Sequence, residues 1–206
     1  APSASRYEVP KQEEPSKPKQ HSLYAGSIWL GGISESNGQL GVVASTYRQT
    51  HYALWPGPID NRNGGMYIDS MICNEWDRHF KIDQSDIATF LFRYKMGKIE
   101  DVDDIPEAVL FWPGRNNPHL NNQISDMDHS LAPFNDLNSN DGIYDPMTGD
   151  FPLIKGDQAI WWIMNDIGND KEFGGITGAS VPIGLEVHVM AHAYATNDPL
   201  NDITLY

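Results

Sequence analysis

The chain has 206 residues, with 28 acidic and 14 basic side chains and a formal net charge of −14 at pH 7. This length suits one domain, with or without an extension, and it can bury a core without disulfide staples. A surface this acidic repels nucleic acid and anionic lipid and attracts cations, so we discount the first two as partners and expect divalent metals instead.

Turn-forming and aromatic residues are both abundant, with 18 Gly, 14 Pro, 6 Trp and 9 Tyr. This combination favours a sheet protein with long, structured loops. The single cysteine, Cys73, excludes an intrachain disulfide, and we interpret it as a buried thiol. No run approaches the roughly 20 apolar residues of a membrane span.

Residues 1–21 form a polar segment with Pro10, Pro15 and Pro18 among charged side chains. The segment has too few apolar residues to fold alone, and its prolines favour extended backbone. The chain opens without a signal peptide, which we interpret as a mature or trimmed end. We expect the tail to lie on its own domain or on a neighbouring chain.

The first predicted elements after the tail are strands. The apolar runs at 24–30 and 40–47 are separated by turn residues and are predicted to pair as a hairpin. A Pro- and Gly-rich loop follows at 55–58. Residues 76–82 then alternate apolar and polar, which predicts a half-buried strand.

The clearest helix signal comes next. Asp83 or Ser85 is the expected N-cap, apolar residues recur at helical spacing, and Gly97 is the expected stop, so a helix is predicted at 85–97. A second, short helix is predicted at 105–110, where a proline lies near the first turn.

The last part of the chain starts with a long loop, 113–158, which needs something to organise it. A buried strand is predicted at 160–165 and a longer one at 183–195. On the longer strand one face is apolar, with Val187 and Val189 expected at its centre. Residues 203–206 begin another strand.

These elements predict a mainly β fold. We expect an antiparallel, jelly-roll-like β-sandwich with one or two short helices and long structured loops. The expected domains are an extended tail at 1–21 and a β-rich domain at 22–206. A calcium-loop insertion is expected around 134–150.

Several short motifs occur in an order that resembles one family. They are RYEVP (6–10), AGSIWLGG (25–32), TYRQ (46–49), WPGP (55–58), WDR (76–78), PEA (106–108), LAPF (131–134), GD (149–150), KGDQAIWW (155–162) and GLEVH (184–188). Together they resemble the N-terminal region of large secreted or cell-surface proteins of Bacteroidota that are exported by the type IX secretion system. The resemblance implies an extracellular location, and it supplies no catalytic role to carry over to this chain. The C-terminal sorting domain of such proteins is not in this chain.

The strongest chemical signal is an Asp- and Asn-rich loop. Side-chain oxygens at alternate positions followed by glycine match the needs of a Ca²⁺ loop. The match to an EF-hand is incomplete, because the glycine falls one place late and Met147 stands where a bidentate acid is expected. The candidate metal-site residues are Asp136, Asn138, Asn140, Gly142, Tyr144, Asp145 and Asp150. The alternative is a loop whose side chains bond to their own backbone.

One face of the predicted strand 183–195 carries Glu186, His188 and His192. Side chains of this kind and spacing can bind zinc. However, His192 lies about 13 Å beyond His188 at the usual rise per residue, so one ion cannot easily reach all three. We favour a polar face that meets solvent or another sheet.

No nucleophile elbow, phosphate-binding glycine loop or HExxH motif occurs, so we expect no enzyme. The predicted function is a structural or adhesive module of an extracellular surface protein, fibre or appendage, stabilised by calcium. Its expected partners are other chains of the same assembly, with surface glycans as a further possibility. A carbohydrate-binding module, with Tyr52, Trp55 and Trp112 as stacking platforms, is the first alternative. A secreted hydrolase is the second.

Overall fold

The computed structural model describes residues 29–33, 38–43, 54–60, 68, 70–120, 131–137, 140–167, 182–195 and 203–205. The expected tail at 1–21 lies outside these residues, as do Tyr52 and Asn138. Among the described helices, none combines the length and apolar character needed to cross a membrane.

The chain divides into two compact units that alternate along the sequence. The first unit contains the described residues within Arg78–Trp162 and His188–Tyr206. The second contains those within Glu14–Asp77 and Ile163–Val187. Two of the strands therefore begin in one unit and end in the other.

The first two strands form a hairpin in the second unit. β1 (Leu30–Ile33) pairs antiparallel with β2 (Leu40–Val43), which confirms the predicted pairing. β1 reaches Ile33, beyond the predicted end at residue 30. Gly31 and Gly32, expected to close the strand, instead pair with Val42 and Gly41 in the ladder.

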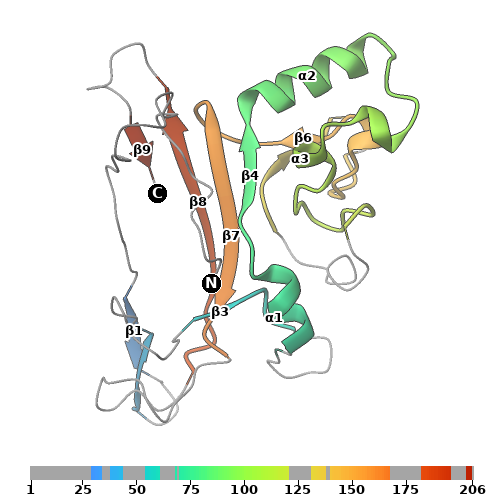
Figure 1. Cartoon of the computed structure of the whole chain (residues 1–206). Helices are drawn as coiled ribbons and strands as arrows, with labels where there is room; N and C mark the ends of the chain where they lie inside the picture. The colour runs from blue at the N-terminus through green and yellow to red at the C-terminus, as the bar shows by residue number, and fades with distance from the viewer. Residues whose placement is uncertain are drawn as a thin grey trace, which may run out of the picture. The chain divides into compact units, whose positions relative to one another are not determined.

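The main sheet is ordered β3-β7-β8-β9, and β4 also pairs with β7 (Figure 1). Its pairings β3–β7, β4–β7 and β8–β9 are antiparallel. The bounds are β3 Trp55–Pro56, β4 Phe80–Asp83, β7 Gln158–Asn165, β8 Glu186–Tyr194 and β9 Ile203–Leu205. The described part of the chain is thus mainly β with antiparallel pairing and few helices, which confirms the predicted class.

β7 is the strand on which the sheet is built. Its residues Ala159, Ile160, Trp161 and Ile163 are all at most 4% exposed. The near-continuous apolar run makes both faces of β7 suitable for burial, and the prediction of a buried strand here is confirmed.

β8 follows the predicted alternation only in part. Ala191 and Ala193 are buried, as expected for the apolar face, and His188 on the opposite face is exposed. Val187 and Val189, expected at the centre of the core, are half-buried. Burial on this strand is therefore greatest toward its C-terminal end.

The prediction of a strand at 76–82 is wrong for its first half. α1 (Ser70–Trp76) occupies the start of that segment, and β4 begins only at Phe80. α1 contacts β3, and its last residue, Trp76, is 1% exposed. Long-range packing of Trp76, rather than local alternation, sets the conformation here.

The two predicted helices are confirmed. α2 (Gln84–Lys95) starts after Asp83, whose main-chain N–H donates to the Asp86 carboxylate over 3.4 Å. The helix gives way to Gly97 at a φ of 61°. α3 (Glu107–Leu110) follows Pro106. Both helices contact β4, and their buried residues Phe90 and Val109 belong to the core of the first unit.

The segment expected as one long loop contains short regular pieces. β5 (Phe134–Asn135) pairs antiparallel with β6 (Phe151–Pro152), and these strands bracket the expected calcium loop. One 3-10 turn in this segment, η2 (Pro146–Thr148), precedes β6. A second 3-10 turn, η1 (Val102–Asp104), lies outside the segment and precedes α3.

A tight turn before β7 connects three elements of the first unit. Asp157 donates its N–H to the Ala193 oxygen over 2.8 Å and accepts at its own main-chain oxygen from Gln84 over 2.9 Å. Its carboxylate accepts from the Ala195 N–H over 2.9 Å. The preceding Gly156 has a φ of 76°, and a Cβ on it would overlap the Ala193 oxygen.

This geometry predicts a large cost for Gly156→Ala. The variant combines the strain of a left-handed alanine with a clash against β8, and we expect it to lose about 3 kcal/mol of unfolding free energy. Gly97→Ala is the matched control, since Gly97 is also left-handed but has nothing within 4 Å of its Cβ position. Gly97→Ala should lose about 1 kcal/mol. Urea unfolding measures both, and equal losses would contradict the predicted contact with β8.

Candidate functional site

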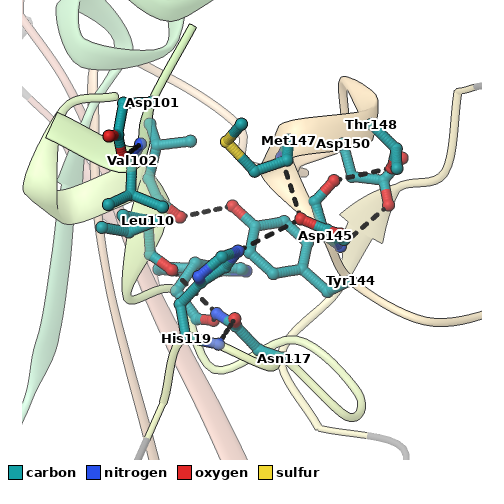
Figure 2. A network of polar contacts seen from close by, with 12 residues as sticks. Asp101, Val102, Leu110, Asn117, His119, Tyr144, Asp145, Met147, Thr148 and Asp150 are labelled. Carbon is teal, nitrogen blue, oxygen red and sulfur yellow. Dashed lines mark hydrogen bonds and ion pairs between the residues drawn. The ribbon is translucent and has the colours of Figure 1, made fainter. Parts of the chain in front are cut away.

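The connection between α3 and β7 is organised around Tyr144. This side chain is fully buried, and its hydroxyl donates to the Val109 oxygen over 2.5 Å (Figure 2). Phe134 contacts the Tyr144 ring edge-on, with centroids 5.3 Å apart. Burial, and then the charges of Asp150 and Asp145, raise the pKa of Tyr144 far above its ordinary value. The phenol therefore stays a neutral hydrogen-bond donor.

Gly114 makes room for this ring. A Cβ at position 114 would lie 2.5 Å from the Tyr144 Cβ, too close for any larger residue without rearrangement. The main-chain N–H of Tyr144 donates to the Arg115 oxygen over 2.8 Å. The segment after α3 is thus held against the acidic loop at Tyr144.

A buried asparagine fixes the same segment from the other side. Asn117 is 1% exposed, and its amide donates to the main-chain oxygens of Leu110 and Trp112 over 2.9 and 2.8 Å. Its side-chain oxygen accepts from the His119 N–H over 2.9 Å. Figure 2 shows His119 directed at Asp145, with Nε2 lying 3.2 Å from Oδ1.

Asp150 is the most buried carboxylate of the loop, with no exposed surface. One oxygen accepts from the Leu137 N–H and the other from the Asp145 N–H, each over 3.0 Å. The pKa of Asp150 is raised above its ordinary value, chiefly by burial and further by the charges of Asp136 and Asp141, although both hydrogen bonds act to lower it. The loop thus concentrates negative charge around a buried acid.

Asp136 closes the other end of the loop. Its two oxygens accept from the Asn140 N–H over 2.7 Å and the Gly142 N–H over 2.9 Å. Asn140 and Gly142 have φ values of 48° and 73°, the left-handed conformation that turns the chain back on this carboxylate. Asp141 accepts in turn from the Ile143 N–H over 2.8 Å.

Most of the metal-site residues predicted from the sequence lie in this loop. Asp136, Asp145 and Asp150 all bind main-chain N–H groups, which is the pattern of the alternative interpretation. The Tyr144 hydroxyl is bonded to Val109, so only its main-chain oxygen remains for a ligand. Over the described ranges, no three acidic, His or Cys side chains are grouped so as to hold a metal ion.

Glu186, His188 and His192 have separate partners. The Glu186 carboxylate accepts from the Ile59 N–H over 2.7 Å, and His188 contacts the Trp161 ring edge-on with centroids 5.8 Å apart. His192 Nδ1 lies 3.0 Å from the Lys155 oxygen. Each side chain has a local structural contact, which fits the expected polar face better than a zinc site.

Of the aromatic residues considered for sugar stacking, Trp112 is core. It is 1% exposed, and its indole N–H donates to the Pro133 oxygen over 3.1 Å. Trp55 is half-buried in β3. Trp112 therefore offers no face to a ligand, and the expectation of sugar stacking at this residue is wrong.

A second carboxylate that the sequence did not single out lies in the second unit. Asp166 is fully buried and accepts from the N–H groups of Ile183, Gly184 and Leu185. The neighbouring Asn165 donates to the Gly57 oxygen over 2.7 Å. Asn165 is the last residue of β7 and Asp166 follows it, and their bonds connect this end of the strand to the start of β8 and to the turn after β3.

No family model matches the chain, and neither the curated proteins nor the solved structures include a significant match to it. The described geometry alone defines an acidic, mainly β protein in which hydrogen-bonded carboxylates, one of them fully buried, organise the connection between α3 and β7.

The raised pKa of Asp150 predicts how stability depends on pH. Since the folded pKa exceeds the unfolded one, the contribution of this acid is fully present below the unfolded pKa, about 3.9, and is lost as pH rises through the folded pKa. The difference in unfolding free energy between the wild type and Asp150→Asn should therefore shrink as pH rises from about 3 to 7.

Asp104→Asn is the control of opposite sign. Main-chain hydrogen bonds from Glu100 and Asp101 lower the pKa of Asp104, so its contribution is present above the unfolded pKa and lost in acid. The wild-type advantage over this variant should grow as pH rises. Urea melts at a series of pH values measure both, and parallel trends for the two variants would contradict the assignment.

Proposed function

We propose that the chain is a structural or adhesive module of an extracellular surface protein, fibre or appendage, stabilised by calcium, and that it is not an enzyme. The observation that carries the proposal is the fully buried Asp150, whose pKa is raised by burial and by the neighbouring Asp136 and Asp141. A bound cation would offset that repulsion and hold the loop more firmly. The formal charge of −14 favours cation uptake by the whole chain.

Calcium suits this loop better than a softer metal because the available donors are oxygens. A carboxylate oxygen that accepts one N–H keeps another lone pair for a cation. The proposed ligands are therefore drawn from Asp136, Asp145 and Asp150, from Asn138 and Asn140, and from the main-chain oxygens near Gly142 and Tyr144. Binding would require the loop carboxylates to adjust from their present contacts with N–H groups.

The proposed location rests on the sequence resemblance to secreted and cell-surface proteins of Bacteroidota that use the type IX secretion system. A module of such a protein needs stability and a surface for partners rather than a reactive centre. Labelling intact cells of the producing organism with an antibody against this chain tests the location. Signal found only after cell lysis would contradict it.

We further propose a jelly-roll-like β-sandwich as the finer fold. Its support is the antiparallel pairing throughout the described β1–β2, β5–β6 and main-sheet pairs. An experimental structure in which no second sheet faces the main sheet would contradict this part of the proposal.

The proposed partners are other copies or other chains of the same assembly, with glycans as a further partner. β9 pairs with β8 of its own sheet and stands last in the strand order, so it needs no second chain to form. The outer edge of such a strand is a template for pairing with another chain.

The assembly proposal predicts that millimolar calcium or added salt promotes association, because the charge of −14 opposes it. Light scattering of the whole chain and of a version lacking residues 1–21 measures this and separates the contribution of the tail. A monomer in both cases under all conditions would count against assembly through this chain.

The calcium proposal predicts that Ca²⁺ raises the melting temperature by mass action, with about 2.7 kcal/mol of added stability at a hundredfold excess over Kd. Asp136→Ala should abolish the gain. Asp103→Ala is the matched control, since Asp103 is an exposed acid in η1, outside the loop, and this variant should keep the gain in full. Thermal melts of each protein in calcium and in chelator measure this gain. Identical melting curves for the wild type in the two conditions would contradict the calcium proposal.

A further inference from the structure

The first unit has an open groove beside β4. Its volume is about 430 Å³, within the usual range for a ligand site. One wall comes from β4 and the residues just before it, and the other from the first turns of α2 and α3. The side chains that matter for binding are Arg78, Phe80, Lys81, Asp86, Glu107 and Phe111. None of the loop carboxylates from 136 to 150 lines it.

The β4 wall is basic. The Arg78 guanidinium lies over the Phe80 ring, 4.4 Å from its centroid. Lys81 Nζ is 3.8 Å from the Asp83 carboxylate, a long and partly exposed ion pair that leaves the ammonium able to donate elsewhere. This wall therefore offers hydrogen-bond donors.

The helix wall is acidic. Asp86 lies in the first turn of α2 and Glu107 in the first turn of α3. One Asp86 oxygen accepts from the Asp83 N–H, and Glu107 is exposed. This wall therefore offers acceptors. The lining holds two acids, Asp86 and Glu107, two bases, Arg78 and Lys81, and His79, so with a neutral histidine the formal charges of the groove cancel.

An aromatic ring and small apolar residues lie between these polar groups. Phe111, which directly follows α3, is 38% exposed, a large fraction for a phenylalanine, and Pro106 and Ala108 line the groove near it. An exposed ring beside convergent donors and acceptors is the combination that holds a flat ligand with both an apolar face and polar edges.

We infer that this groove binds a neutral saccharide chain. The C–H face of a sugar ring stacks on an aromatic side chain, and its hydroxyls donate to carboxylates and accept from Arg or Lys at once. The balanced formal charge of the groove favours a neutral ligand. The net charge of −14 on the whole chain repels an anionic polymer. The open form of the groove lets a chain continue past the bound rings.

This inference gives the glycan contact proposed above a place on the molecule, and it is independent of the calcium site. Loss of the calcium effect in melting experiments leaves it untouched. Failure of saccharide binding likewise leaves the calcium proposal standing, so the two fail separately.

The test is calorimetric titration of the whole chain with three probes: a panel of neutral hexasaccharides of different linkage, an oligouronate of equal length, and an extended peptide of mixed charge. We expect binding of at least one neutral hexasaccharide, with an affinity that does not change between low and high salt, because no net charge is neutralised. Phe111→Ala should weaken binding about tenfold by removing the stacking surface.

Two further variants separate binding from folding. Phe92→Ala is the matched control, since Phe92 is a more exposed phenylalanine on α2 that does not line the groove, and it should bind as the wild type does. Glu107→Gln keeps the shape of an exposed side chain and should weaken binding with the melting temperature unchanged. No neutral hexasaccharide bound at millimolar concentration, binding of the uronate or the peptide alone, or equal effects of Phe111→Ala and Phe92→Ala would each overturn the inference.

Discussion

The connection from α3 to β7 must provide hydrogen-bond acceptors for its own main-chain N–H groups. The rest of the first unit depends on how it does so. Within the described part of this connection, β5 and β6 are strands of two residues each. Outside them the N–H groups need other acceptors, because a buried N–H without an acceptor costs about as much as a lost hydrogen bond. Carboxylates supply the missing acceptors. Asp136 serves two N–H groups, Asp150 two more, and Asp145 that of Met147. Part of the acidity of the chain therefore has a structural role, as acceptors for main-chain N–H groups.

This solution concentrates like charges, and the protein limits the cost locally. The Asp145 carboxylate lies beside the His119 ring, and the buried hydroxyl of Tyr144 is kept neutral. Asp150 has no exposed surface, and burial raises its pKa. A bound cation would reduce the repulsion between these carboxylates, which the hydrogen bonds offset only in part. This is the reason for proposing the metal site in this loop.

The sequence predicts elements whose signals are local. α2 has a cap at Asp83 and a stop at Gly97, and β7 is an apolar run too short for a buried helix. Both elements can therefore be predicted from the sequence. α1 cannot be, because the alternation from Trp76 to Ile82 also fits a strand. Only the contact of α1 with β3, remote in sequence, separates the two conformations at Trp76.

The same division applies to the candidate site. The acids of the loop follow from their spacing, since short polar side chains next to glycine bond to nearby N–H groups. Gly114 and His119 were missed because their roles depend on residues far along the chain: Gly114 lies under the Tyr144 ring and His119 faces Asp145. Asn117 was missed although its hydrogen-bond partners lie within 7 positions of it. Tyr144 was named only as a candidate ligand, because no local signal in the sequence shows that its ring belongs to the core.

The alternation of the two units along the chain limits how recombination can move them between genes. Each unit is assembled from separate stretches, and β7 and β8 both pass from one to the other at Trp162 and Val187. Because each unit is built from separate stretches, no single cut in the gene releases either unit whole. Recombination must therefore move the region as one cassette, so relatives with different neighbouring domains should carry both units or neither.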